Sequence, residues 1–346
     1  MAYTPIDKGG NFFNTKLYTG NAGTNNITGV GFKPDWLWLK KRNASANNFL
    51  FDVIRGVSKE LNSNNTEAEA SPANYLASFN SDGFTIGSDS DINGNNDTLV
   101  AWQWKAGTSF TNDASSTSVG SIDSAGSVNT DAGFSIVSFT GGGANATIKH
   151  GLTSKPSMII VKARGRTSTW SVYHTSLGAT KFLRLEGTNA VGTEAGWWNN
   201  TEPTSSVFSI GTNHYANTQI AYCFGDVQGF SKFGSYTGNG NADGPMIYTG
   251  FKPAFVLQKR TDAVYDWQLH DNKRSSSGGN NLVNSRLEPN ATNVESTDNI
   301  GYDFLSNGFK TRTNNANYNA SGGTYIYMAF AENPFTSSAG TPVTAR

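Results

Sequence analysis

The stretch TGVGFKPDWLWLKKR at residues 28–42 decides the fold, because a close variant, YTGFKPAFVLQKR, occurs again at residues 248–260. A third version, KPSMIIVKAR, occupies residues 155–164. In each version a lysine follows a proline by six positions across an apolar run; the pairs are Pro34 with Lys40, Pro156 with Lys162, and Pro253 with Lys259. An internal repeat outranks any single motif as an indicator of architecture.

The repeat stays in register along most of the chain. Each version follows an aromatic–Thr–Gly element and precedes an apolar strand opened by Thr, and these strands are TLVAWQW from Thr98, TQIAYCF from Thr218 and TYIYMAF from Thr324. The aromatic residue precedes the lysine by 22, 23 and 23 residues, and the Thr by 80, 79 and 88. This register predicts three tandem modules of about 100 residues, a size typical of a β-sandwich.

The composition also favours strands over helices. The chain has 38 Gly among 346 residues, 12% aromatic and only 15% charged residues, with Asn, Ser and Thr between the apolar runs. Gly and Asn suit tight turns, while aromatic and β-branched side chains suit a pleated sheet. We therefore expect an all-β protein in which runs such as DWLWL are strands covered on both faces, whereas LVAWQW alternates and is half exposed.

The register sets the expected domain boundaries. They are an N-terminal arm over 1–14, β-sandwich modules over 15–108, 133–229 and 230–335, a Ser-rich linker over 109–132, and a C-terminal tail over 336–346. The Ser-rich stretch has a second interpretation, an extended segment along a neighbouring sheet. Nothing separates the second and third modules, so we expect rigid contact between them through Phe224 to Phe233.

Charge and cysteine content exclude several classes of protein. With 26 basic and 26 acidic residues and no run of either sign, the chain lacks the positive footprint of a nucleic-acid or anionic-membrane binder. No apolar run approaches the length of a membrane span, and the first residues do not resemble a signal peptide, so we expect a soluble protein without membrane insertion. The single cysteine, Cys223, sits in an apolar run and is expected to be buried.

No catalytic constellation emerges from the spacing, and we expect neither an enzyme nor a cofactor. The four histidines lack partners at metal-ligand spacing, and the repeated pairs Asp52 with Arg55 and Asp271 with Arg274 are typical of structural ion pairs. DSDING, residues 89–94, fills half of a calcium-loop pattern, but Val100 stands where the loop needs a bidentate acid. We expect no metal; a calcium alternative would use Asp89, Asp91 and Asn93.

The loops in which the copies differ are the better candidates for binding. Trp197 and Trp198 lie in GWWNNTEP, which has no counterpart in the other copies. Adjacent tryptophans in a loop can stack on sugar rings or anchor an interface, and they can equally fill a gap between modules. Tyr215 and Tyr318, on the turns before the last strands, are candidates of the same kind.

Taken together, these strings resemble a family of virion proteins from marine tailed phages, of the cyanophage and pelagiphage kind. The matching marks are AYTPIDKGGNFFNTKLYTGN at the start, the two GFKP strands, and YIYMAFAENPFTSSAGTPVTAR at the end. The resemblance implies tandem jelly-roll sandwiches similar to concanavalin or laminin-G domains, in tail-fibre-like structural proteins. It offers no catalytic residues. The second copy departs most, with HGLTSKP in place of GFKP.

The resemblance implies a tail-fibre or receptor-binding appendage that contacts host surface glycans. Its expected partners are other virion proteins, a host surface polysaccharide or receptor, and further copies of the chain, with a trimer as one option. The expected location is the virion, at the tail or capsid exterior, after assembly in the host cytoplasm. One alternative is a capsid decoration or head-fibre protein that docks through Phe12 and Phe13 of its N-terminal arm. A more remote alternative is a polysaccharide depolymerase.

Overall fold

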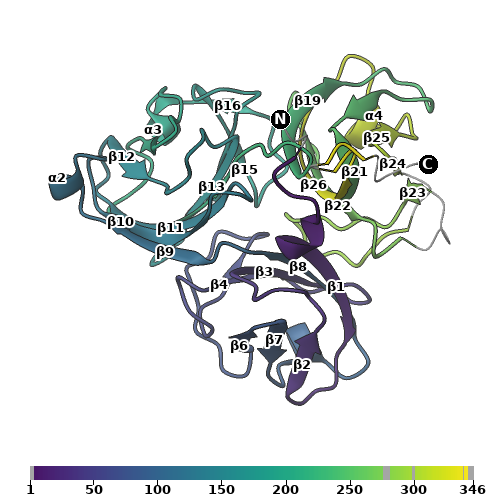
Figure 1. The fold of residues 1–346 in the computed structure, drawn as a ribbon, viewed down its shortest axis with the longest axis horizontal. Coiled ribbons are helices and arrows are strands. Elements are labelled where there is room, and N and C mark those ends of the chain that lie inside the picture. The colour runs from purple at the N-terminus through teal and green to yellow at the C-terminus, as the bar shows by residue number, and fades with distance from the viewer. Residues whose placement is uncertain (1–3, 276–280, 298–300, 338, 342–346) are drawn as a thin grey trace.

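The computed structural model describes residues 4–275, 281–297, 301–337 and 339–341. Over this part of the chain the fold is all-β, with six antiparallel sheets and a few one-turn helices. The strands fall into three consecutive groups: a first strand group over residues 13–104, a second over 108–224 and a third over 231–334. Figure 1 shows these groups arranged around a common centre.

The first strand group is built from a five-stranded sheet of order β1-β8-β3-β4-β5 and a three-stranded sheet of order β2-β7-β6. Leu37 of the larger sheet and Phe84 of the smaller one belong to the apolar cluster that both sheets share, so the two sheets pack as in a β-sandwich. The elements are η1 (Gly9–Asn11), β1 (Phe13–Thr19), β2 (Asn25–Thr28), β3 (Trp36–Lys41), β4 (Asn48–Asp52), β5 (Leu61–Asn62), β6 (Leu76–Asn80), β7 (Gly83–Ile86), α1 (Ser90–Asn93) and β8 (Thr98–Trp104).

The second strand group has an eight-stranded sheet of order β16-β15-β14-β13-β18-β11-β10-β9 and a two-stranded sheet, β12-β17. Its elements are β9 (Thr108–Asn112), α2 (Ala114–Thr117), β10 (Ser124–Asn129), β11 (Phe134–Gly141), β12 (Ala146–Lys149), β13 (Met158–Ala163), β14 (Ser171–His174), β15 (Lys181–Arg184), β16 (Gly192–Thr193), α3 (Ala195–Trp198), β17 (Val207–Ile210) and β18 (Asn217–Phe224).

The third strand group has two four-stranded sheets, of orders β19-β26-β21-β22 and β20-β25-β24-β23. Its elements are β19 (Ser231–Thr237), β20 (Met246–Tyr248), β21 (Phe251–Arg260), β22 (Trp267–Asp271), β23 (Leu282–Val283), β24 (Tyr302–Leu305), β25 (Gly308–Thr311), α4 (Ala316–Asn319) and β26 (Thr324–Pro334).

The same strand order recurs in the three groups, as β1-β8-β3-β4, β11-β18-β13-β14 and β19-β26-β21-β22. The repeated sequence stretch forms β3, β13 and β21, as its apolar pattern predicts. Every residue of β3 is buried, so the expectation of a strand covered on both faces is confirmed.

Two sequence expectations need correction. Residues 109–132 are not a free linker: they contain β9 and β10, and β10 pairs with β11 over six residues, which extends the second sheet. The second interpretation, an extended segment on a neighbouring sheet, is the correct one. The LVAWQW strand, β8, is not half exposed, because every residue after Thr98 is buried. Its second face packs against the other strand groups.

One apolar core joins all three groups. The last strand of each group places an aromatic ring at the centre: Trp104, Phe224 and Phe330. Their ring centroids lie 6.4 Å apart for Trp104 and Phe224, 6.2 Å for Phe224 and Phe330, and 5.7 Å for Trp104 and Phe330. These residues occupy the same position of the repeat, so they form a central ring triad with approximate threefold character. Phe224 also contacts Phe233 at 6.1 Å, as expected for the second and third groups.

Around this triad, each pair of strand groups is joined by the same kind of hydrogen bond, and we call each of these three contact regions a junction. The buried lysine of each repeated strand donates to a threonine carbonyl of another group: Lys40 to Thr292 at 3.2 Å, Lys162 to Thr66 at 3.1 Å and Lys259 to Thr188 at 3.2 Å. Each of these carbonyls also accepts a backbone N–H from the lysine's group, from Ala46, Ser168 and Tyr265 respectively. The contacts run cyclically, from first to third, third to second and second to first.

A second contact closes each junction, with one informative exception. Trp102 Nε1 donates to Asp271 at 2.9 Å and Tyr222 OH donates to Asp52 at 2.7 Å. The third junction has Met328 at the position of Trp102 and Tyr222, and a thioether cannot donate.

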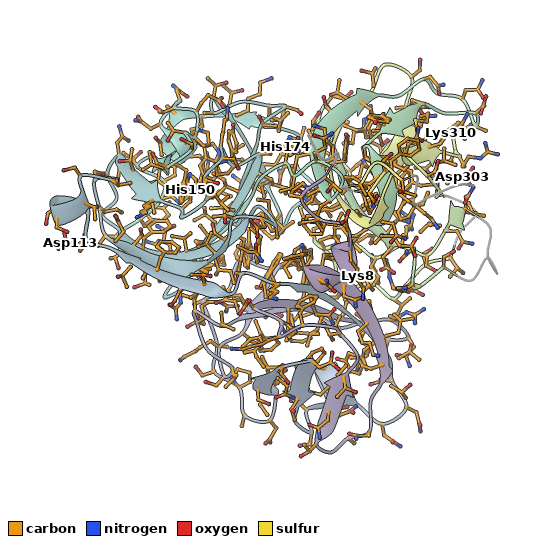
Figure 2. The ribbon with its side chains drawn as sticks, in the orientation of Figure 1. Lys8, Asp113, His150, His174, Asp303 and Lys310 are labelled. Carbon is orange, nitrogen blue, oxygen red and sulfur yellow. The ribbon has the colours of Figure 1, made fainter. Side chains whose placement is uncertain are left out.

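At this third junction His174 replaces the aspartate, where the second and third groups meet in Figure 2. Burial lowers the pKa of His174 to about 4, so the ring is neutral at pH 7. Its Nδ1 accepts from the Ser176 N–H, which leaves Nε2 to donate to the Tyr327 carbonyl at 3.1 Å. At the other two junctions the last strand supplies the donor, whereas here the last strand supplies the acceptor and His174 supplies the donor.

The structural role expected for the repeated acid–arginine pairs is confirmed. Asp52 with Arg55 and Asp271 with Arg274 form ion pairs whose side chains are fully buried. A glutamate extends each pair to an arginine of the neighbouring group: Glu69 bridges Arg55 and Arg164, and Glu295 bridges Arg274 and Arg42. Because these charges are desolvated, removing one partner would leave an uncompensated buried charge.

Phe224→Ala should destabilise the whole chain, because its ring touches all three groups. We expect a loss of about 3–5 kcal/mol in the free energy of unfolding. In guanidinium titrations followed by tryptophan fluorescence and by far-UV circular dichroism, both signals should show one transition, shifted to the same lower guanidinium concentration. Phe335→Ala, at a 36% exposed position, serves as control and should change it by less than about 0.5 kcal/mol. A biphasic transition in which only one phase moves would contradict the shared core.

The three junction lysines should make stability rise with pH. Burial lowers the pKa of Lys40, Lys162 and Lys259 to about 8, while an unfolded lysine keeps a value near 10.5. Between these values the unfolded chain binds more protons, so the free energy of unfolding increases from pH 8 toward pH 10, by on the order of 2 kcal/mol for each lysine. Lys162→Met should remove about a third of this rise.

The exposed Lys155→Met is the matched control and should leave the rise intact, since Lys155 is 43% exposed. Denaturant titrations at pH 7.5, 8.25 and 9.0 measure the effect, because unfolded tyrosines, with a pKa near 10, are still mostly protonated at these pH values. A free energy of unfolding that does not change with pH in the unaltered protein would contradict the lowered pKa of the three lysines.

Candidate functional site

The two tryptophans predicted as ligand contacts lie on α3 and point into the second strand group. Trp198 is 1% exposed and packs edge-on to Tyr173 at 5.9 Å, so its prediction as a ligand contact is wrong. Trp197 is 9% exposed and lies over Phe182 at 5.0 Å, with one edge at a pocket. Adjacent residues on one helical turn differ by about 100°, which lets both indoles reach the core beneath a single turn.

The two tyrosine candidates have opposite outcomes. Tyr318 is fully buried on α4, where its hydroxyl donates to Gln268 at 2.9 Å, so its prediction as a ligand contact is wrong. The sequence places Tyr318 in a turn, and the one-turn helix folds that turn over the sheet. Tyr215 is 44% exposed, and the Arg166 guanidinium lies 4.0 Å from its ring centroid.

The N-terminal arm is folded onto the chain instead of extending as a docking element. Phe13 is 2% exposed and stacks on Phe330 at 5.1 Å, beside the central ring triad. Phe12 is half-buried and contacts Phe230 at 6.0 Å. The proposed docking role of Phe13 is therefore wrong, because its ring completes the protein's own core, and Phe12 keeps only a partly exposed edge.

The calcium alternative also fails at its central residue. Asn93 is fully buried, and its amide nitrogen donates to Asn21, Gly23 and Gly87 while its oxygen accepts from Asn21 and Asn25. Asp89 caps α1 by accepting the Asp91 N–H, and Asp91 accepts from Tyr75. The stretch DSDING is thus a hydrogen-bonded turn. Over the described ranges, no three His, Cys, Asp or Glu side chains gather as metal ligands.

A pocket in the second strand group brings two of the sequence candidates together. It has a volume of about 350 Å³, and Trp197 and Tyr215 both line it. Its other walls come from β13 and the loop after it, from the end of β15, from the residue before α3, and from β18 and the turn that precedes it. They contribute Val161, Ala163, Arg166, Thr167, Ser168, Thr169, Arg184, Glu194, Asn213, His214 and Gln219. We call this the arginine pocket.

The charges of the arginine pocket are unbalanced. Arg166 and Arg184 are exposed and form no ion pair with any described carboxylate. Glu194 is the one acid in the lining, and it already accepts from Trp197 Nε1 at 3.2 Å and from Asn213 Nδ2 at 2.8 Å. Two arginines therefore line the pocket together with a single carboxylate, which is hydrogen-bonded to neutral donors.

A buried histidine forms part of the same wall. His214 is 3% exposed, and its Nδ1 lies 3.0 Å from Gln219 Oε1. Burial lowers the pKa of His214 to about 4, although Gln219 and the nearby Trp197 carbonyl act in the opposite direction, so the ring is neutral at pH 7. His214 thus builds part of the wall of the pocket without adding a charge to it.

One family model matches residues 8–334, and its description is a domain of unknown function, DUF7483. The chain belongs to the DUF7483 family. No curated protein matches it. The match spans all three strand groups, so the arginine pocket lies within the DUF7483 domain. No helix in its described part is long and apolar enough to cross a membrane.

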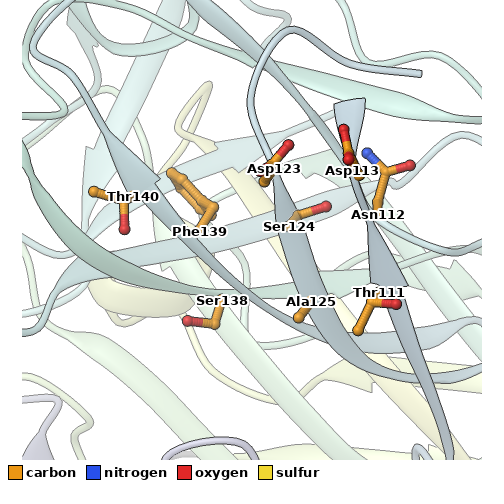
Figure 3. A pocket seen from close by; sticks show the side chains of 9 residues that line it. All are labelled: Thr111, Asn112, Asp113, Asp123, Ser124, Ala125, Ser138, Phe139 and Thr140. Atoms are coloured by element: carbon orange, nitrogen blue, oxygen red, sulfur yellow. The ribbon is translucent and has the colours of Figure 1, made fainter. Parts of the chain in front are cut away.

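The outer face of the DUF7483 domain also carries a shallow groove of about 670 Å³ over β9, β10 and β11. Figure 3 shows its nine lining side chains, which include Thr111, Ser138 and Thr140. Its two acids are already engaged, since Asp113 caps α2 and Asp123 accepts from the Ala114 N–H. The groove therefore offers hydroxyl groups without an unsatisfied charge, and it is a less specific candidate than the arginine pocket.

Sequence reasoning missed the arginines because each is unremarkable in isolation. Their signal lies in the repeat register. Arg166 follows the junction lysine by four positions, where the other groups have Ala44 and Ala263. Tyr215 precedes the last-strand Thr by three positions, where they have Asn95 and Ser321.

Asn93→Ala should destabilise the protein, because it removes several buried hydrogen bonds of the 89–94 turn. We expect a loss of about 2–4 kcal/mol in unfolding free energy, against little change for the exposed neighbour variant Asn95→Ala. Thermal unfolding with EDTA and with added Ca²⁺ should give the same midpoint. A midpoint that rises with Ca²⁺ and falls with EDTA would restore the calcium site.

Proposed function

We propose that the protein is a structural component of a phage virion, a tail-fibre or receptor-binding appendage that contacts host surface glycans without catalysis. The single observation that carries this proposal is the cyclic, thrice-repeated junction around the central ring triad. A body closed in this way is stiff, and its loops face outward. The resemblance of the N- and C-terminal strings to marine tailed-phage virion proteins supplies the biological setting.

The finer architecture belongs to the same proposal. We interpret the three strand groups as three copies of one jelly-roll sandwich module, of the concanavalin or laminin-G kind. The shared strand order and the matched lysine contacts support this count. Three such modules in one chain take the arrangement of a symmetric trimer, in which equivalent surfaces meet around one axis. Any further homo-oligomer then uses the outward faces.

The approximate threefold favours a second candidate, a capsid decoration or head-fibre protein. A body with three similar faces matches a local threefold position on a capsid lattice, because repeated surfaces meet repeated surfaces there. Such a protein would dock through its outward faces, since Phe13 is buried in its own core. Its location would be the capsid exterior, with other virion proteins as partners.

Two measurements test the proposal. Antibody labelling of virions carrying the protein should place it at the tail, and fluorescently labelled protein should bind host cells in a way that free host surface polysaccharide competes. Labelling over the capsid lattice without cell binding would favour the decoration protein. Absence from virions would refute both.

A further inference from the structure

We propose that the arginine pocket binds an acidic saccharide, one whose ring carries a carboxylate or a sulfate. This inference rests on the proposed function and names the ligand class and its site. It starts from two guanidinium groups, those of Arg166 and Arg184, which line one pocket of about 350 Å³ and form no ion pair with the described residues. A pocket of this size lies at the lower end of small-ligand sites, which span about 300–1,000 Å³.

The charge of the lining selects an anionic group. A guanidinium presents several N–H donors in a planar fork that matches the oxygens of carboxylate, sulfate or phosphate groups. The lining has two arginines and one acid, Glu194, whose oxygens accept from Trp197 and Asn213, so the pocket keeps a net positive charge. The position of Arg166 is fixed by its stacking on Tyr215 at 4.0 Å, which reduces the entropy that it would lose on binding.

The uncharged lining selects a sugar ring over a bare anion. Arg166 covers one face of the Tyr215 ring, so the apolar surface to which the C–H face of a sugar ring can pack is the remaining exposed part of Tyr215, which is 44% exposed, together with Trp197. Thr167 adds a hydroxyl group to the lining, and Asn213 adds an amide group. Sugar hydroxyls are both donors and acceptors, so they can satisfy such mixed polar atoms.

The repeat supplies an independent reason to place the site in the second strand group. The equivalents of Arg166 and Tyr215 are Ala44 and Asn95 in the first group and Ala263 and Ser321 in the third. The neighbouring Arg260 of the third group is paired with Asp262 at 2.8 Å. The residues shared by all groups build the junctions, whereas these residues occur once and face solvent. A single pocket per chain is the expected stoichiometry.

The test is isothermal titration of the full chain with trigalacturonate, with a sulfated galactan trisaccharide and with neutral galactotriose. We expect at least one acidic trisaccharide to bind one site per chain, with an affinity about tenfold or more above that of galactotriose. Arg166→Ala and Arg184→Ala should each weaken this binding by about tenfold or more. Arg166→Lys should bind weakly as well, because it keeps the charge but loses the fork.

The matched control is Arg312→Ala, an arginine that is 46% exposed in the third strand group, which should bind like the unaltered protein. Circular dichroism and thermal unfolding of each variant establish that it folds. Binding by the carboxylate ligand alone, or by the sulfated ligand alone, supports the site and identifies the anion. Equal binding of galactotriose, unchanged affinity in both arginine variants, or no binding by any of the three sugars overturns it.

The two proposals fail separately. If the sugars do not bind but the labelled protein still binds host cells, the arginine pocket is excluded and the receptor-binding function stands. If an acidic sugar binds in the pocket but the protein is absent from virions, the site stands and the virion function is excluded.

Discussion

The contact among Trp104, Phe224 and Phe330 at the centre is the constraint on which the rest of the structure depends. For these rings to meet, the last strand of each group must lie with one face toward the other two groups and the opposite face over its own second sheet. That requirement explains why β8 is buried along nearly its whole length. It also explains why Phe13 of the N-terminal arm is drawn into the core instead of extending outward.

The polar contacts around the centre fix how each strand group is oriented relative to the next, which the apolar core alone does not determine. Lys40, Lys162 and Lys259 reach the same kind of carbonyl across each junction. Hydrogen bonds are directional, so they select one rotation of each group against the next. The second contact has diverged: two junctions pair an aromatic donor with an aspartate, and the third uses His174 as the donor. In each case the buried polar group has a partner, as desolvation requires.

The sequence predicts the local parts of this fold well and their assembly poorly. Pro34, Pro156 and Pro253 set the register from which the strands β3, β13 and β21 follow, because strand periodicity is a local property. What covers the second face of a strand is not local, so the pattern of β8 indicates a half-exposed strand, and the pattern of residues 109–132 leaves open both a linker and an extended segment on a sheet. No feature of the chain's linear pattern indicates that three sandwich-like groups close into a ring.

The candidate site shows the same division. Of the four aromatic candidates, Tyr215 and Trp197 line the arginine pocket, whereas Trp198 and Tyr318 are buried on one-turn helices whose packing no pattern indicates. Arg166 is found only by aligning the three copies and asking where one of them differs. Residues at shared positions build the junctions, whereas residues that occur in one copy only include both buried ones, such as Trp198, and exposed ones, such as Arg166.

Native-state hydrogen exchange tests the central claim, that the three strand groups form one cooperative body around a common core. If it is correct, the most protected amides of β8, β18 and β26 will open with the same free energy, within about 1 kcal/mol, because none of these strands can separate without exposing the central ring triad. Opening of one last strand at a free energy several kcal/mol below the other two would contradict it, since that group would then unfold by itself.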